Sequence, residues 1–141
     1  YPGGWELNYR DKLNQKDAIV TLISPSTKER IERAIAEGFK GYYPSGDIYI
    51  FRKTLGQIHN LEEYLKMNQF PNGDVIEYKK FSLRDYNAYE ARIGGYGTYY
   101  AIEIEHNKYI YEIFFESKSE SSQLSNDERR IIDSFLFLEE K

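Results

Sequence analysis

Cysteine is absent from this chain of 141 residues, so disulfide bonds, thiolate metal sites and a thiol nucleophile are all excluded. Tryptophan and methionine occur once each, whereas tyrosine occurs 14 times and phenylalanine 8 times. Tyrosine is common at recognition surfaces, but it is also a strong strand former. Because most of these tyrosines fall in runs with strand-like alternation, we interpret them mainly as strand residues.

Positive charge is in deficit, since 19 Lys and Arg stand against 23 Asp and Glu and give a net charge of -4. Binding to a nucleic-acid backbone or to an anionic membrane surface requires a basic face. Here the cations are dispersed among more numerous carboxylates. No apolar run approaches the roughly 20 residues of a membrane helix. We therefore expect no nucleic-acid partner and no membrane span.

The length of the chain fits one domain, and we expect residues 1–141 to form a single globular unit. No internal repeat or low-complexity tract interrupts it. The chain begins at Tyr1 and not at Met, so we expect a processed form or a trimmed piece that has lost any targeting segment.

Three helix starts are marked by residues that satisfy the open backbone donors of a first turn. Ser26–Glu29 reads as a capping box after Pro25, and the helix that follows is expected to stop at Gly38. Asn60 and Ser125 predict the other two starts, each with acidic residues in the first turn.

Runs with strand character fill the remaining chain. Strands are predicted over 5–9, 18–23, 47–52, 75–83, 86–93, 99–106, 109–115 and, briefly, 135–138. Helices placed among antiparallel strands predict an α+β domain. We expect an antiparallel sheet of six to eight strands with helices packed on its faces, as in an α/β/α sandwich.

The last two long strands predict a specific register. Asn107-Lys108 reads as a two-residue hairpin turn, because Asn tolerates the positive φ that such turns demand. This turn places Ile102 opposite Ile113 and makes one face of the hairpin apolar. The other face then brings Glu103 opposite Glu112.

Several segments of the chain occur in an order that is known from another family. They are Tyr1-Pro2-Gly3-Gly4-Trp5, Ile23-Ser24-Pro25, Leu61 with Tyr64 and Leu65, Ala101–Ile104, Tyr109–Phe115 and Ile131–Phe137. Together these segments resemble the PsbP-like family, which contains the extrinsic P subunit of photosystem II and many exported prokaryotic proteins. The resemblance implies a central antiparallel sheet between helical layers. The helix expected near Thr27–Glu37 departs from the family pattern, and no functional residue is carried over.

The paired carboxylates Glu103 and Glu112 are the one electrostatically tense feature, because like charges directly across strands destabilise a sheet. Plain solvent exposure is one resolution. The others are a neighbouring cation such as Arg92, a raised carboxyl pKa, or a bound metal such as Ca²⁺. His106 lies at the end of the strand that carries Glu103. The candidate metal ligands are therefore Glu103, Glu112 and His106, although we assign no metal and no cofactor.

Other catalytic patterns are missing. There is no Gly-x-Ser-x-Gly turn, and His59 and His106 are the only histidines that could serve as a base. Gly94-Gly95-Tyr96-Gly97 lacks the Gly-Lys-Ser/Thr end of a phosphate loop and reads as a hairpin loop.

Candidate binding residues are aromatic side chains in expected loops. Tyr96 sits in the glycine-rich loop, and Tyr42 and Tyr43 precede Pro44. Their rings could contact a protein groove or a sugar.

We therefore expect a non-enzymatic binding or accessory domain that lies outside the cytoplasm and contacts a protein or an envelope component. The alternative is a small-ligand or metal-dependent enzyme that uses carboxylates on the sheet face. A third possibility is a purely structural domain of a longer chain.

Overall fold

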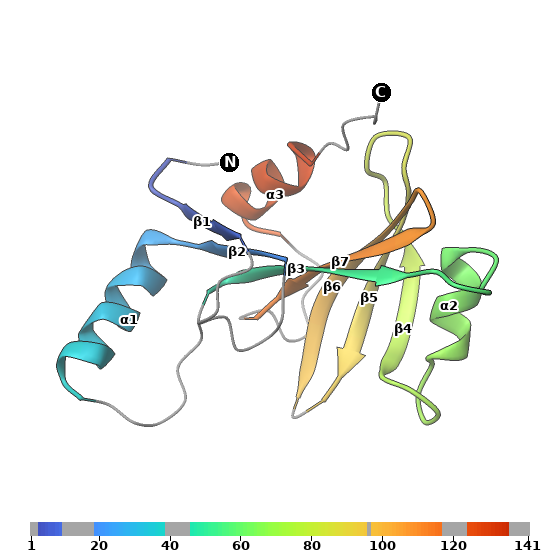
Figure 1. Cartoon of the computed structure of the whole chain (residues 1–141), viewed down its shortest axis with the longest axis horizontal. Coiled ribbons are helices and arrows are strands. Elements are labelled where there is room, and N and C mark those ends of the chain that lie inside the picture. Colours follow the sequence, from blue (N-terminus) through green and yellow to red (C-terminus); the bar gives the residue numbers. More distant parts are fainter. Residues whose placement is uncertain (1–2, 10–18, 39–45, 96, 117–123, 136–141) are drawn as a thin grey trace.

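The computed structural model describes residues 3–9, 19–38, 46–95, 97–116 and 124–135. These residues form seven strands and three helices, shown in Figure 1. In chain order they are β1 (Glu6–Tyr9), β2 (Val20–Ile23), α1 (Pro25–Ala36), β3 (Ile48–Thr54), α2 (Leu61–Met67), β4 (Val75–Lys80), β5 (Asn87–Gly94), β6 (Thr98–His106), β7 (Tyr109–Phe115) and α3 (Asn126–Asp133).

All seven strands belong to one antiparallel sheet with the order β1-β2-β3-β7-β6-β5-β4. The last four strands form a meander, and β3 joins the first three strands to it by pairing with β7. The sheet twists strongly. In Figure 1, β1 and β2 therefore lie roughly horizontally, whereas β4 and β5 lie roughly vertically. The α+β class and the expected strand number are confirmed.

The hairpin of β6 and β7 has the predicted register. Ile102 lies opposite Ile113 and Glu103 lies opposite Glu112. Asn107 and Lys108 have φ values of 48° and 67°, the positive values that the tight two-residue turn requires. Alternation along both strands therefore sends the isoleucines to one face and the glutamates to the other.

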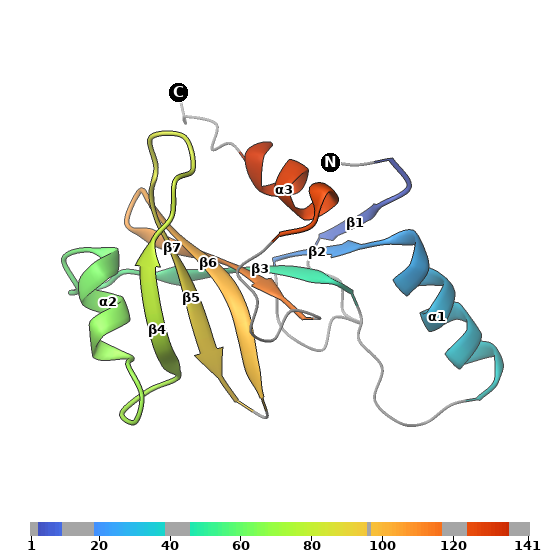
Figure 2. The same ribbon diagram turned by 180° about the vertical axis from the view of Figure 1, so that it is seen from behind.

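Each face of the sheet has its own apolar cluster. On the first face, Ile102, Ile104 and Ile113 pack with Ile131 and Ile132 of α3. On the second face, the cluster is smaller and is built around Leu61 and Leu65 of α2. Figures 1 and 2 show α3 and α2 on either side of the sheet.

Helix α1 is the exception to the expected packing. It extends away from the sheet beyond β2 in both views (Figures 1 and 2), and Thr27 is its one buried residue. Thr27 is held by Asp47, whose Oδ1 accepts a 2.7 Å hydrogen bond from the Thr27 hydroxyl. The expectation that helices cover the sheet faces is therefore wrong for α1. Among the helices described, none combines the length and the apolar character needed to cross a bilayer.

The cap of α1 also differs from the prediction. Ser24 is the N-cap and Pro25 occupies the first helical position, because proline needs no intrahelical partner for its nitrogen. The capping box at Ser26 is therefore wrong, whereas the caps at Asn60 and Ser125 are confirmed. Gly38 follows the helix with a φ of 70°, as a stop requires.

Two strand predictions fail in the C-terminal two thirds of the chain, one at the end of β4 and one after α3. Strand β4 ends at Lys80, and the predicted continuation to Leu83 is wrong because Phe81 and Leu83 turn into the first apolar cluster. The short closing strand is also unsupported: Phe135 lies outside any strand, and residues 136–138 fall outside the described part of the chain.

The hairpin turn generates a stability prediction. Lys108 adopts a left-handed conformation that glycine adopts without steric cost, so Lys108→Gly should raise the free energy of unfolding by about 0.5–1 kcal/mol. Urea denaturation measures the change. Lys108→Ala is the matched control, because it removes the same side chain but keeps Cβ. An equal effect of both substitutions would contradict the prediction.

Candidate functional site

The paired carboxylates of β6 and β7 lie in the interior. Glu103 is 1% exposed and Glu112 is 9% exposed. Solvent exposure therefore does not explain how the sheet tolerates the two acidic groups. The Oε2 atom of Glu103 has no hydrogen-bond partner among the described residues. Two acidic groups are thus buried side by side, an arrangement that requires compensation.

Lys53 of β3 supplies the compensating charge. Its Nζ lies 3.4 Å from Oε2 of Glu112 and donates a 3.1 Å hydrogen bond to the hydroxyl of Tyr64 on α2. Of the alternatives left open by the sequence, a neighbouring cation is present, but it is Lys53 and not Arg92. Arg92 points to the opposite face and pairs there with Glu77.

A raised carboxyl pKa reduces the remaining repulsion between the two glutamates. Burial raises the pKa of Glu103 well above its ordinary value, and the neighbouring carboxylate of Glu112 raises it further. Burial alone would lower the pKa of Lys53, but Glu112 and Glu103 outweigh it and raise that pKa above its ordinary value. The repulsion within the pair is therefore reduced in two ways, by the nearby ammonium group of Lys53 and by the raised pKa of Glu103, which favours the neutral form of that acid.

A third carboxylate on this face anchors α2. Glu105 accepts a 2.6 Å hydrogen bond from the backbone N–H of Leu61 and a 3.2 Å bond from the amide of Asn87. This bond satisfies a first-turn donor of α2 that has no partner inside the helix. Glu105 therefore fixes the start of α2 against the sheet.

His106 does not join the predicted metal ligands. Even-numbered residues of β6 face the side opposite Glu103, and the His106 ring packs edge-on against Tyr86 at 6.1 Å. The described residues contain no group of three or more metal-ligating side chains. His59 lies apart from all of these groups, exposed beside Glu63 at 3.0 Å.

The predicted aromatic residues Tyr42, Tyr43 and Tyr96 lie outside the described residues. The glycine loop that carries Tyr96 does connect β5 to β6 as expected. The backbone N–H of Gly94 donates a 2.6 Å bond to the carbonyl of Asp74, which places this loop beside the turn between α2 and β4.

The end of α2 and the turn that follows it present the most exposed large apolar side chains of the described residues, together with Ile35 of α1. Met67 is 60% exposed and Phe70 is 69% exposed. We call Met67, Phe70 and the exposed Pro71 the apolar tip. Backbone bonds fix its conformation, with Phe70 N–H donating to Val75 and Val75 N–H donating to Asn68.

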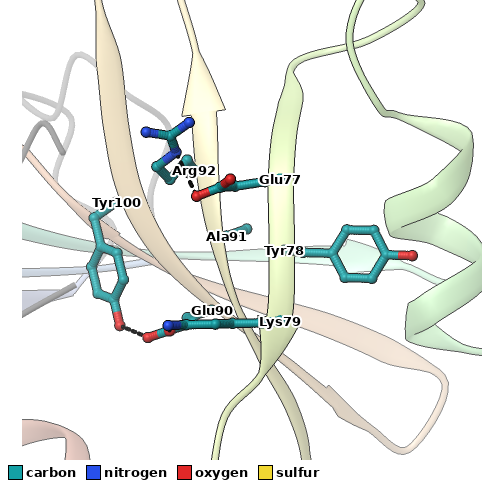
Figure 3. Close-up of a pocket in the computed structure, with 7 residues that line it drawn as sticks. All are labelled: Glu77, Tyr78, Lys79, Glu90, Ala91, Arg92 and Tyr100. Atoms are coloured by element: carbon teal, nitrogen blue, oxygen red, sulfur yellow. Dashed lines mark hydrogen bonds and ion pairs between the residues drawn. The ribbon is translucent and has the colours of Figure 1, made fainter. Parts of the chain in front are cut away.

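A pocket of about 290 Å³ lies on the first face of the sheet, beyond the cluster that α3 covers. Figure 3 shows its residues on β4, β5 and β6. The polar residues that line it are Glu77, Lys79, Glu90, Arg92 and Tyr100. Tyr78 and Ala91 pack into the α2 cluster on the other face and contribute backbone to the floor.

Sequence reasoning missed both the pocket and the role of Lys53. A signal for the pocket exists, because Glu77 and Lys79, like Glu90 and Arg92, carry opposite charges two residues apart on one strand face. Recognising it requires the β4–β5 register, which the connecting residues do not fix.

Comparison of the chain with protein-family models, with curated proteins and with solved structures gives no match. The resemblance to the PsbP-like family therefore stays a prediction.

The buried acid makes stability depend on pH. The folded state keeps the Glu103 proton at pH values where the unfolded chain, with the ordinary pKa of 4.5, releases it. The free energy of unfolding should therefore fall as the pH rises from that value toward the raised pKa. Glu103→Gln removes this loss, so its stability relative to wild type should grow with pH by up to about 1.4 kcal/mol per pH unit.

Urea denaturation at a series of pH values measures this difference. Glu29→Gln on exposed α1 is the control and should show no such growth, since that carboxylate is 71% exposed. A constant difference between Glu103→Gln and wild type at all pH values would show that Glu103 titrates as an ordinary acid.

Proposed function

We propose that the chain is a non-enzymatic binding domain that contacts a protein component of a larger assembly through its apolar tip. The observation that carries the proposal is Phe70, which is 69% exposed on a turn held by backbone hydrogen bonds. Exposed aromatic side chains on a fixed turn can enter a partner's pocket with little loss of conformational freedom.

The charge of the chain favours a protein over a lipid partner. The tip is flanked by Lys66 and Asp74, whose charges cancel, and the whole chain is acidic. An anionic membrane surface attracts clusters of Lys and Arg, which this end of the sheet lacks among the described residues.

The carboxylates of the second face support a structural role over catalysis. Lys53 lies 3.4 Å from Glu112, the pKa of Glu103 is raised, and both carboxyl groups are buried. A general acid or base must reach a substrate, which this burial opposes. The alternative of an enzyme that uses Glu103, Glu112 and His106 is disfavoured further because His106 faces the other side.

The PsbP-like assignment and a location outside the cytoplasm are parts of the same proposal. Helices α2 and α3 on opposite faces support the assignment, whereas α1 is an addition to that pattern. The coding sequence upstream of Tyr1 tests the location. A signal peptide, with or without a lipid-attachment cysteine, supports export, and a cytoplasmic domain fused there would contradict it.

The apolar tip is tested with a double variant, Met67→Ser with Phe70→Ser. A protein that binds the wild-type domain should be identified from extract and purified, and its affinity measured by calorimetry. The double variant should bind at least about tenfold more weakly, because it loses the contact area of both side chains.

Ile35→Ser is the matched control, since Ile35 is a comparably exposed apolar residue on α1. It should leave the affinity unchanged. Equal affinity of the double variant and wild type would contradict the proposal. Sedimentation with phosphatidylglycerol vesicles that depends on Phe70 would contradict it in favour of a lipid contact.

A further inference from the structure

Two ion pairs cross from β4 to β5 in the pocket of the first face, with opposite polarity. Glu77 lies opposite Arg92 and Lys79 lies opposite Glu90 in the strand register. Arg92 Nε is 2.9 Å from Glu77 Oε1, and Lys79 Nζ is 2.9 Å from Glu90 Oε1. The pocket therefore carries two positive and two negative charges in alternating positions (Figure 3).

The Lys79–Glu90 end of the pocket is internally satisfied. Glu90 is 9% exposed, and its second oxygen accepts a 2.7 Å hydrogen bond from the hydroxyl of Tyr100. Burial raises the pKa of Tyr100 to about 12, so this hydroxyl remains a donor at physiological pH. Both carboxylate oxygens of Glu90 thus have partners, and this end serves to hold β4, β5 and β6 together.

The Glu77–Arg92 end is incomplete. The Nε atom of Arg92 is buried, and although Glu77 is close, its oxygen is not aligned to accept a hydrogen bond from it. No partner of the two terminal nitrogens of Arg92 is found among the described residues, and in Figure 3 they point away from Glu77. Glu77 itself is 66% exposed. The Arg92 side chain is 35% exposed and lines the pocket, so its terminal nitrogens are open to the carboxylate of a ligand.

We infer that this pocket binds a small zwitterion of the α-amino-acid class, whose carboxylate meets the terminal nitrogens of Arg92 and whose ammonium group meets Glu77. A guanidinium group matches a carboxylate through two parallel hydrogen bonds. A ligand with only a negative charge would be repelled by Glu77 and Glu90. A ligand with only a positive charge would be repelled by Arg92 and Lys79. A ligand that carries both charges meets an opposite charge at each end.

The size of the pocket fits this class. Its volume of about 290 Å³ is at the lower limit of small-molecule pockets. The site lies on the first face of the sheet and shares no residue with the apolar tip. The inference is therefore independent of the proposed protein contact, and either can fail without the other.

The test is a titration of the ¹⁵N-labelled domain with L-alanine, followed by the backbone amide shifts. Saturable shifts are expected at Glu77, Arg92 and Tyr100. N-acetyl-L-alanine lacks the ammonium group and L-alaninamide lacks the carboxylate. Each should bind at least about tenfold more weakly, because one charged contact is lost.

Variants assign the contacts to side chains. Arg92→Gln should abolish saturation, Arg92→Lys should retain part of the affinity without the paired geometry, and Glu77→Gln should weaken binding of L-alanine but not of the acetyl derivative. Lys80→Gln is the control, because Lys80 lies on β4 but contacts Asn87 and the Tyr89 ring outside the pocket.

Three results would overturn the inference. The first is the lack of saturable shifts with L-alanine in the wild-type domain. The second is equal binding of L-alanine and either derivative, which would reduce the site to a single-charge contact. The third is unchanged binding by Arg92→Gln.

Discussion

The register of the β6–β7 hairpin is the constraint on which the rest of the structure depends. Side chains alternate between the faces of a strand, so a shift of one residue would exchange the contents of both faces. In the observed register, Ile102 and Ile113 complete the cluster beneath α3, while Glu103 and Glu112 meet on the opposite face. The left-handed turn at Asn107 and Lys108 closes the hairpin at this pairing and at no neighbouring one.

This register places Glu103 beside Glu112, and residues from elsewhere in the chain offset the repulsion between them. Lys53 comes from β3 and contacts both Glu112 and Tyr64 of α2. A buried pair of like charges would oppose folding, whereas two carboxyl groups beside an ammonium group that also contacts a hydroxyl form a connected polar network. This network and the bond from Leu61 to Glu105 position α2. The second face is thus held by polar contacts at its centre and by an apolar cluster beside them.

Local features of this fold follow from the sequence, and features that depend on distant pairing do not. The hairpin register and the caps at Asn60 and Ser125 are predictable because turn and cap residues act on their immediate neighbours. Ser24 was missed as a cap because Ser26 offers the same side chain two residues later. Lys53 could not be assigned to the carboxylates because nothing local states that β3 lies beside β7. The pocket escaped detection for a related reason, since its ion pairs depend on how β4 aligns with β5.

The pairing of β3 with β7 also bears on how the chain reaches this structure. The four strands of the meander are neighbours along the chain and can pair early, because each closes a short loop. The first three strands join the meander through β3, and 59 residues separate Lys53 from Glu112 across that seam. Contacts over such separations raise the contact order and slow folding. The seam is therefore expected to form late, which leaves the β7 edge of a folding chain open to strands of other molecules until β3 arrives.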